Sequence, residues 1–452
     1  MYRFIFIFFC LISINGYAQQ ETKRCLYRVK LTDKQNVGKL LRHPESYLSE
    51  KSIERRKRQG LAIDETDVPV SQEYIKLIEH TGVKVVSKSK WNNSVVVSSN
   101  DSDIVERLNT LECVSDVEKV WTERAAKVSL RPMVQSLTKT DTVMPGYYGA
   151  AQRQISMLKG DSLHAAGFTG KGVVIAIIDG GFMNADRIPS MQDINILGVR
   201  DFVATGLHQP FAEVDHGTSV LSCMAMKVPH VMVGTAPDAS YWLLRSEDDH
   251  SESLVEEDYW VAAAEFADSV GADVISSSLG YYEFDDKSTS HRYYEQDGRT
   301  ALISRAASML CCKGIVHVNS AGNAGRGTWK KINFPGDAVE ILTVGAVDSA
   351  CLNTAFSSIG PSFDGRVKPD VMAMGSNTAV VDGTGKLTKA NGTSFSCPTI
   401  AGMVACLWQA FPGKTAKEII DIVRRSGDNY KTPDNVFGYG IPDFWRAYTN
   451  NK

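Results

Sequence analysis

The chain has 452 residues, of which 43% are hydrophobic and 22% charged, which is ordinary for a globular protein of two or three domains. Its formal net charge of −3 gives no reason to expect a nucleic acid or an anionic membrane surface as a partner.

The first 18 residues predict a signal peptide. Arg3 precedes an unbroken apolar run over residues 4–14, and Gly16 and Ala18 provide the small residues of a cleavage site. The run of 11 residues (14 − 4 + 1) is short for a bilayer, so cleavage after Ala18 is favoured over the alternative of an uncleaved membrane anchor. The signal peptide predicts an extracytoplasmic protein, periplasmic or secreted. Since no later stretch approaches transmembrane length, we expect no membrane attachment after cleavage.

Eight cysteines remain once Cys10 leaves with the signal peptide. Export permits disulfides, but no C-x-x-C spacing or paired His/Cys pattern indicates a metal site. Cys223, Cys397 and Cys406 lie in apolar helical contexts, which favours buried free thiols at these positions. The pairing of the other cysteines stays open.

Residues 19–121 have the pattern of a small α+β domain, which we expect to be ferredoxin-like. A first strand over 25–31 is followed by a basic helix, a helix capped by Ser71 that stops at Gly82, a hairpin turning near Asn92–Asn93, a further helix and a final strand. The basic run 55–58, "RRKR", predicts a solvated helix face, with a processing site as the alternative.

Residues 122–145 lack periodicity and are predicted to be a linker suited to cleavage. From residue 146 to 452, short β-branched runs alternate with helical stretches. We expect strands over 173–178, 272–278, 314–320 and 341–347, and helices over 215–227, 257–270, 299–312 and 395–410. Near-continuous apolar strands between helices predict an α/β domain with a mostly parallel sheet covered on both faces, and such sheets gather function at the carboxyl ends of their strands.

Two acid–base candidates stand at such positions. Asp179 follows five apolar residues in "IAIIDGGF", and a carboxylate there needs a partner, either a catalytic one or a helix start that it caps. His216 opens a predicted helix at "HGTS", where the alternative is an ordinary satisfied histidine.

Two further candidates lie later in the chain. Asn323 in "NSAGNAG" is either a turn residue or an oxyanion donor. Ser394 opens a helix in "NGTSFSCP", where it is either a cap or a nucleophile supported by the positive helix end. Because residue 396 is Ser, the stretch is not the G-x-S-x-G elbow of an α/β-hydrolase.

Ten motifs in order make the chain similar to the subtilisin-like serine endopeptidases (subtilases, family S8). They include "VVIAIIDGGF", "DHGTSVLSCMA", "ADVISSSLG", "NSAGNAG", "VKPDVMAMG" and "GTSFSCPTIAGMVACL", and they span most of residues 147–445. The resemblance implies a triad of Asp179, His216 and Ser394 with Asn323 as the oxyanion residue.

The resemblance also implies a substrate cleft and a zymogen. Ser278, Leu279 and Gly280 would pair with the backbone of an extended peptide, and Gly322 would border the pocket for the residue before the scissile bond. The N-terminal domain is similar to the subtilase propeptide, a folding chaperone and inhibitor, with residues 33–70 as an extra insertion. We expect polypeptide substrates and a monomer.

The chain departs from the family at a few positions. Gly180 follows Asp179 where many members have Ser or Thr, and Ser219 replaces a common second histidine. The chemistry requires no cofactor, and although structural calcium fits the family, its usual ligands cannot be matched here. The residue after Asn323 is the uncharged Ala324, so the sequence does not predict an enzyme that strongly prefers a charged residue in its substrate. A catalytically silent scaffold protein and a peptide ligase of the same fold are the alternative functions.

Overall fold

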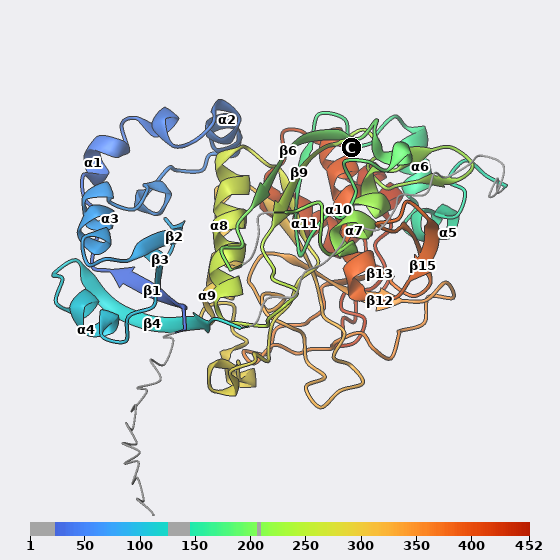
Figure 1. The fold of residues 1–452 in the computed structure, drawn as a ribbon. Coiled ribbons are helices and arrows are strands. Elements are labelled where there is room, and N and C mark those ends of the chain that lie inside the picture. The colour runs from blue at the N-terminus through green and yellow to red at the C-terminus, as the bar shows by residue number, and fades with distance from the viewer. Residues whose placement is uncertain (1–22, 125–144, 206–208) are drawn as a thin grey trace, which may run out of the picture.

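The computed structural model describes residues 23–124, 145–205 and 209–452. Within them, the N-terminal residues form a four-stranded antiparallel sheet, and the rest surrounds a seven-stranded parallel sheet. Figure 1 shows the smaller unit lying beside the larger one, against helix α8 (Val255–Ser269). The predicted signal peptide and most of the predicted linker lie outside the described residues.

The N-terminal unit has the expected ferredoxin-like arrangement, with strand order β2-β3-β1-β4. Apolar residues at every second position of its strands, such as Val95 and Val97, face a small core under the helices. The elements are β1 (Cys25–Leu31), α1 (Val37–Leu40), α2 (Glu50–Gln59), α3 (Gln72–Glu79), β2 (Lys84–Ser89), β3 (Ser94–Ser99), α4 (Ile104–Asn109) and β4 (Val114–Thr122).

Two predictions for this unit have different outcomes. Ser71 caps α3 as expected, since its hydroxyl oxygen accepts from the backbone N–H of Tyr74 at 3.3 Å. The solvated face predicted for residues 55–58 is wrong for half of the run, because Arg55 and Arg56 are each 1% exposed. Both are buried against the larger unit, which provides acidic partners. The charge of the run in the sequence does not show that this contact exists.

The larger unit has the predicted parallel sheet, with the order β13-β12-β11-β10-β5-β9-β6 and every neighbouring pair parallel. The strands are β5 (Val174–Asp179), β6 (Asn195–Asp201), β9 (Ser240–Arg245), β10 (Val274–Ser277), β11 (Val316–Ser320), β12 (Leu342–Val347) and β13 (Val371–Met374). Four of them match the predicted strands, whereas β6, β9 and β13 were missed. The short pairs β7 (Lys227–Val228) with β8 (Met232–Val233), and β14 (Thr378–Val381) with β15 (Leu387–Ala390), lie outside this sheet.

Helices cover both faces of the sheet, as Figure 1 shows. They are α5 (Gln152–Ser156), α6 (Gly160–Ala165), α7 (His216–Ala225), α8, α9 (Leu302–Met309), α10 (Thr393–Ala410), α11 (Ala416–Arg425) and α12 (Phe444–Thr449). The central helix α10 is buried from its first residue to Trp408. Because all of its faces are covered, it consists almost entirely of apolar and small residues. Among the described residues, no helix has both the length and the apolarity needed to cross a membrane.

The prediction of buried free thiols for three of the cysteines is confirmed. The eight in the described residues are all free, and Cys223, Cys397 and Cys406 are fully buried. The Cys397 thiol donates to the carbonyl oxygen of Val318 at 3.3 Å, and burial raises its pKa to about 12. Cys397 is therefore an inert thiol that packs α10 against the sheet.

Candidate active site

The carboxyl ends of three neighbouring parallel strands bring the predicted residues together. Asp179 is the last residue of β5, Ser278 follows β10, and Gly322 and Asn323 follow β11. Because β11, β10 and β5 are adjacent and parallel, these residues meet at one edge of the sheet. His216 and Ser394 reach the same edge from the first turns of α7 and α10.

Asp179 and His216 form a direct pair. The carboxylate is fully buried, and its Oδ1 lies 2.8 Å from the imidazole Nδ1 and accepts from the Gly180 N–H at 2.8 Å. Its Oδ2 has no partner among the described residues. The pair fixes the imidazole with Nδ1 toward the carboxylate, which leaves Nε2 for the cleft.

The electrostatic surroundings favour the imidazolium form of His216. Burial alone would lower the pKa, but the charge and hydrogen bond of Asp179, with the charges of Glu247 and Asp215, raise the pKa from its ordinary 6.5 to about 9. A histidine with this pKa is a strong base once it is neutral.

Ser394 stands opposite as a largely buried hydroxyl. It does not cap α10, whose first residue follows Gly392 without any capping side chain. Its Oγ donates to the Ser278 carbonyl oxygen at 3.4 Å, and no hydrogen bond joins it to His216 within the described residues. Both side chains line one cleft, and catalytic hydrogen bonds of this kind often tighten only when substrate is bound.

Asn323 is held in one orientation. Its Oδ1 accepts from the Thr393 backbone N–H at 2.9 Å and from the Thr393 hydroxyl at 3.1 Å. The amide Nδ2 is therefore free to donate into the cleft beside the start of α10. This anchoring is the arrangement that an oxyanion donor would need, and the role itself stays a prediction.

The cleft has a volume of about 490 Å³. It is lined by seven of the eight predicted site residues, namely His216, Ser278, Leu279, Gly280, Gly322, Asn323 and Ser394, while Asp179 lies buried behind His216. Gly322 has a φ of +100°, and a Cβ on it would lie 2.7 Å from the Asn333 side chain, so this position requires glycine.

Sequence reasoning missed other residues of the cleft, including Glu247, Asp249, Tyr282 and Asn333. Glu247 and Asp249 follow the carboxyl end of β9, the neighbour of β5 in the sheet. A reading of "SYWLLR" as a strand would have placed the acidic "SEDD" that follows it at the same sheet edge.

The sequence pattern of the subtilase family, Peptidase S8, matches residues 170–440, more than half of the chain. The chain therefore belongs to the subtilase family, and it is a serine-type endopeptidase. A second pattern, the Peptidase S8 propeptide domain of Bacteroidota, matches residues 26–135, so the N-terminal unit is a propeptide.

Individual relatives agree with this assignment. The chain is 28% identical to Subtilisin NAT of Bacillus subtilis subsp. natto over 351 residues, which cover 75% of this chain and 84% of the relative. It is 26% identical to Serine protease AprX of Bacillus subtilis (strain 168) over 386 residues, 78% of this chain and 79% of the relative. The fold is similar to the crystal structure of MycP1 from the ESX-1 type VII secretion system, with a TM-score of 0.53, 21% identity, and coverage of 72% of this chain and 90% of that one.

Proposed function

We propose that the chain is an exported endopeptidase, made as a zymogen, that cleaves peptide bonds through Asp179, His216 and Ser394 and an acyl-enzyme intermediate. The single observation that carries this proposal is the 2.8 Å pairing of His216 with buried Asp179 in the cleft that Ser394 lines.

The first step is attack by Ser394 on the scissile carbonyl carbon. A serine hydroxyl is a weak nucleophile, and the His216 Nε2 takes its proton as the new C–O bond forms. Asp179 keeps the imidazole in the required tautomer and stabilises the imidazolium. The imidazolium then gives its proton to the leaving amine, and water hydrolyses the acyl-enzyme by the same steps.

The negative charge of the tetrahedral intermediate falls between two donors. The free Nδ2 of Asn323 is one, and the backbone N–H of Ser394 in the first turn of α10 is the other. Both are in place before substrate arrives, so their reorganisation costs little during the reaction.

An extended polypeptide fits the cleft beside residues 278–280. The segment continues the line of β10 beyond its last paired residue, Ser277, and so offers backbone groups to a substrate strand. We propose polypeptide substrates, a monomer, and no cofactor for the chemistry.

The propeptide is proposed to inhibit the enzyme for as long as it stays bound. It is attached to α8 by the bidentate pair of Arg28 with Asp258, at 2.8 and 2.6 Å. Glu265 of α8 also accepts from the Ser89 hydroxyl and from the backbone N–H groups of Lys90 and Trp91 at 2.6–2.9 Å. Such a surface keeps the propeptide bound after a single cut.

The test compares residues 19–452 as wild type and as Ser394→Ala. The wild type should cut itself between residues 122 and 146, hydrolyse casein and react with a fluorophosphonate, because each process needs the activated hydroxyl. Ser394→Ala should remain full-length and unlabelled.

The matched control is Ser396→Ala, two residues further along α10. Ser396 is fully buried and its hydroxyl donates to the Thr393 carbonyl oxygen at 2.9 Å. This variant should keep its labelling. A wild type that is neither processed nor labelled would contradict the proposal and favour a silent scaffold, and loss of labelling in Ser396→Ala alone would contradict the choice of nucleophile.

A further inference from the structure

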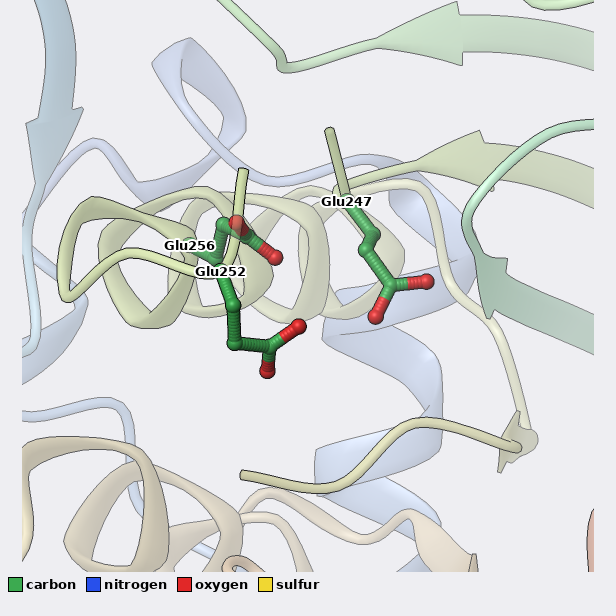
Figure 2. A group of neighbouring side chains, drawn as sticks. All are labelled: Glu247, Glu252 and Glu256. Atoms are coloured by element: carbon green, nitrogen blue, oxygen red, sulfur yellow. The ribbon is translucent and has the colours of Figure 1, made fainter. Parts of the chain in front are cut away.

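Three glutamates meet in the loop that joins β9 to α8. Glu247, Glu252 and Glu256 each place one carboxylate oxygen within 4.8 Å of the other two. Figure 2 shows the three side chains, two from the loop and one from the first turn of α8, pointing toward a common space. The group is partly to fully buried, with Glu256 at 0% exposed.

The described residues offer no lysine or arginine ion pair to any of the three. Burial and the charges of neighbouring carboxylates raise the pKa of Glu247 to about 8 and of Glu252 to about 7. Burial and the other two glutamates also raise the pKa of Glu256. Three carboxylates this close repel one another when ionised, and a cation between them would relieve that repulsion.

Two buried polar atoms at this place lack partners. The start of α8 accounts for one oxygen of Glu256, whose Oε1 accepts from the Ser253 N–H at 3.1 Å, but its Oε2 has no partner. The hydroxyl of Tyr281 is also fully buried and unpartnered within the described residues, and burial and the charges of Glu247, Glu256 and Glu252 raise its pKa. The Glu256 Oε2 is therefore available to a ligand bound between the three glutamates.

The spacing of the oxygens fits a single calcium ion. Any three points within 4.8 Å of one another have a common point no more than about 2.8 Å from each (4.8/√3). Calcium takes six to eight oxygen ligands at about 2.3–2.6 Å in flexible geometry, whereas magnesium demands shorter bonds and near-ideal octahedral geometry. Small side-chain movements would bring these oxygens to calcium distances.

We propose that Glu247, Glu252 and Glu256 bind one calcium ion beside the Asp179–His216 pair. A basic side chain of a substrate is the other cation that such a group attracts. The burial of Glu256 favours a small ion. Solvent does not reach this side chain, so the bulkier guanidinium or ammonium group of a substrate cannot reach its oxygens either.

The site depends on a residue that departs from the family. A Cβ at Gly180 would lie 2.8 Å from Glu247 Oε2, so a Ser or Thr at this position would displace the carboxylate. The glycine after the catalytic aspartate therefore makes room for a calcium ligand.

The experiment measures calcium binding in the Ser394→Ala chain, so its result does not depend on peptidase activity. After removal of divalent ions with EGTA, CaCl₂ is titrated by calorimetry into this parent protein and into the same protein with Glu252→Gln or Glu256→Gln. The matched control is Glu283→Gln, an exposed glutamate in the same region that pairs with Lys287 at 2.8 Å. We expect at least tenfold weaker binding in both cluster variants and unchanged binding in the control.

Thermal unfolding gives a second readout that separates ligand loss from misfolding. Calcium should raise the unfolding temperature of the parent and of the control but not of the cluster variants. In EGTA, the cluster variants should unfold at the same temperature as the parent or higher, because glutamine fills the same space and cannot carry the repelling charge.

Two results would overturn the proposal. One is a parent that does not bind calcium, or whose binding survives both cluster substitutions. The other is unchanged calcium binding together with a loss, in active Glu252→Gln enzyme, of cleavage at sites preceded by Lys or Arg, which would make the group a substrate subsite.

Discussion

Ser394 and Ser278 exchange two hydrogen bonds at the cleft. The Ser278 hydroxyl donates to the Ser394 carbonyl oxygen at 2.9 Å, and the Ser394 hydroxyl donates to the Ser278 carbonyl oxygen at 3.4 Å. The longer, weaker bond is the one that the proposed nucleophile must give up to turn toward His216. The backbone of the first turn of α10 stays in place meanwhile, and with it one of the two proposed oxyanion donors.

Asn323→Ala should lower kcat by roughly 10²–10³-fold with little change in KM, since the lost donor serves charge that develops only in the transition state. Steady-state kinetics on a peptide substrate measure both constants. An unchanged unfolding temperature shows that the loop survives the loss of its bonds to Thr393. A rise in KM without a fall in kcat would assign Asn323 to ground-state binding.

The pH dependence of kcat/KM should follow His216. The general base must be neutral, and the pKa of His216 is raised to about 9, so activity should fall as the pH drops through about 9. Asp215 contributes to that rise, and Asp215→Asn should therefore move the profile toward lower pH. A profile with its midpoint below the ordinary 6.5 would show that the carboxylates around His216 do not control it.

At the scale of elements, helix α8 is where the two units contact each other. Its first turn carries Glu256 toward the proposed calcium site and Asp258 toward the propeptide, since neighbouring residues of a helix face different directions. Further along, Asp268 accepts from Arg55 at 2.6 Å and from Arg56 at 3.0 Å. The segment 33–70, which looked like an insertion, thus supplies buried contacts to α8 through α2.

Breaking one of these contacts should speed propeptide release. In Arg28→Met, Asp258 is left buried without its partner, which should cost roughly 2–5 kcal/mol of binding. The measurement uses Ser394→Ala chains with an inserted site for an unrelated protease between residues 125 and 144. After cutting, the dissociation rate of the propeptide is followed.

The control for this measurement is Lys30→Met, an exposed residue of the same strand. Its dissociation rate should equal that of the parent. Equal rates for Arg28→Met and Lys30→Met would mean that the ion pair contributes nothing to propeptide binding.

At the scale of the whole molecule, the buried ion network decides how the two units separate. Burial would raise the pKa of Asp268, but Lys90, Arg55 and Arg56 outweigh it and lower the pKa below the ordinary 3.8. The stability from this carboxylate is therefore fully present above pH 3.8 and is lost only as the pH falls further.

Mild acid should consequently fail to release the propeptide. The cut Ser394→Ala complex is expected to elute as one species in gel filtration at pH 5 as well as at pH 7.5, and to separate only under stronger acid. Separation already at pH 5 would show that other titrating groups control the interface. Persistence at pH 5 would indicate that activation requires proteolytic destruction of the propeptide.

Much of the site could be predicted from the sequence, because its chemistry is local. Asp179, His216, Asn323 and Ser394 each stand where a strand ends or a helix begins, and the order of their motifs predicts that they meet at one site. Four strands and α10 were predictable from their runs of β-branched or apolar residues, whereas the missed strands β6 and β9 each contain an arginine.

Only the tertiary structure decided which charges are buried and against what. Arg55 and Arg56 have the composition of a solvated surface, and their burial depends on Asp268, more than 200 residues away. Glu252 and Glu256 are four residues apart, as on a helix, but Glu252 lies in the loop before α8 and Glu247 lies further back, so only the folded loop brings the three together. Burial and pairing depend on contacts between distant segments, and a linear pattern records only the segments themselves.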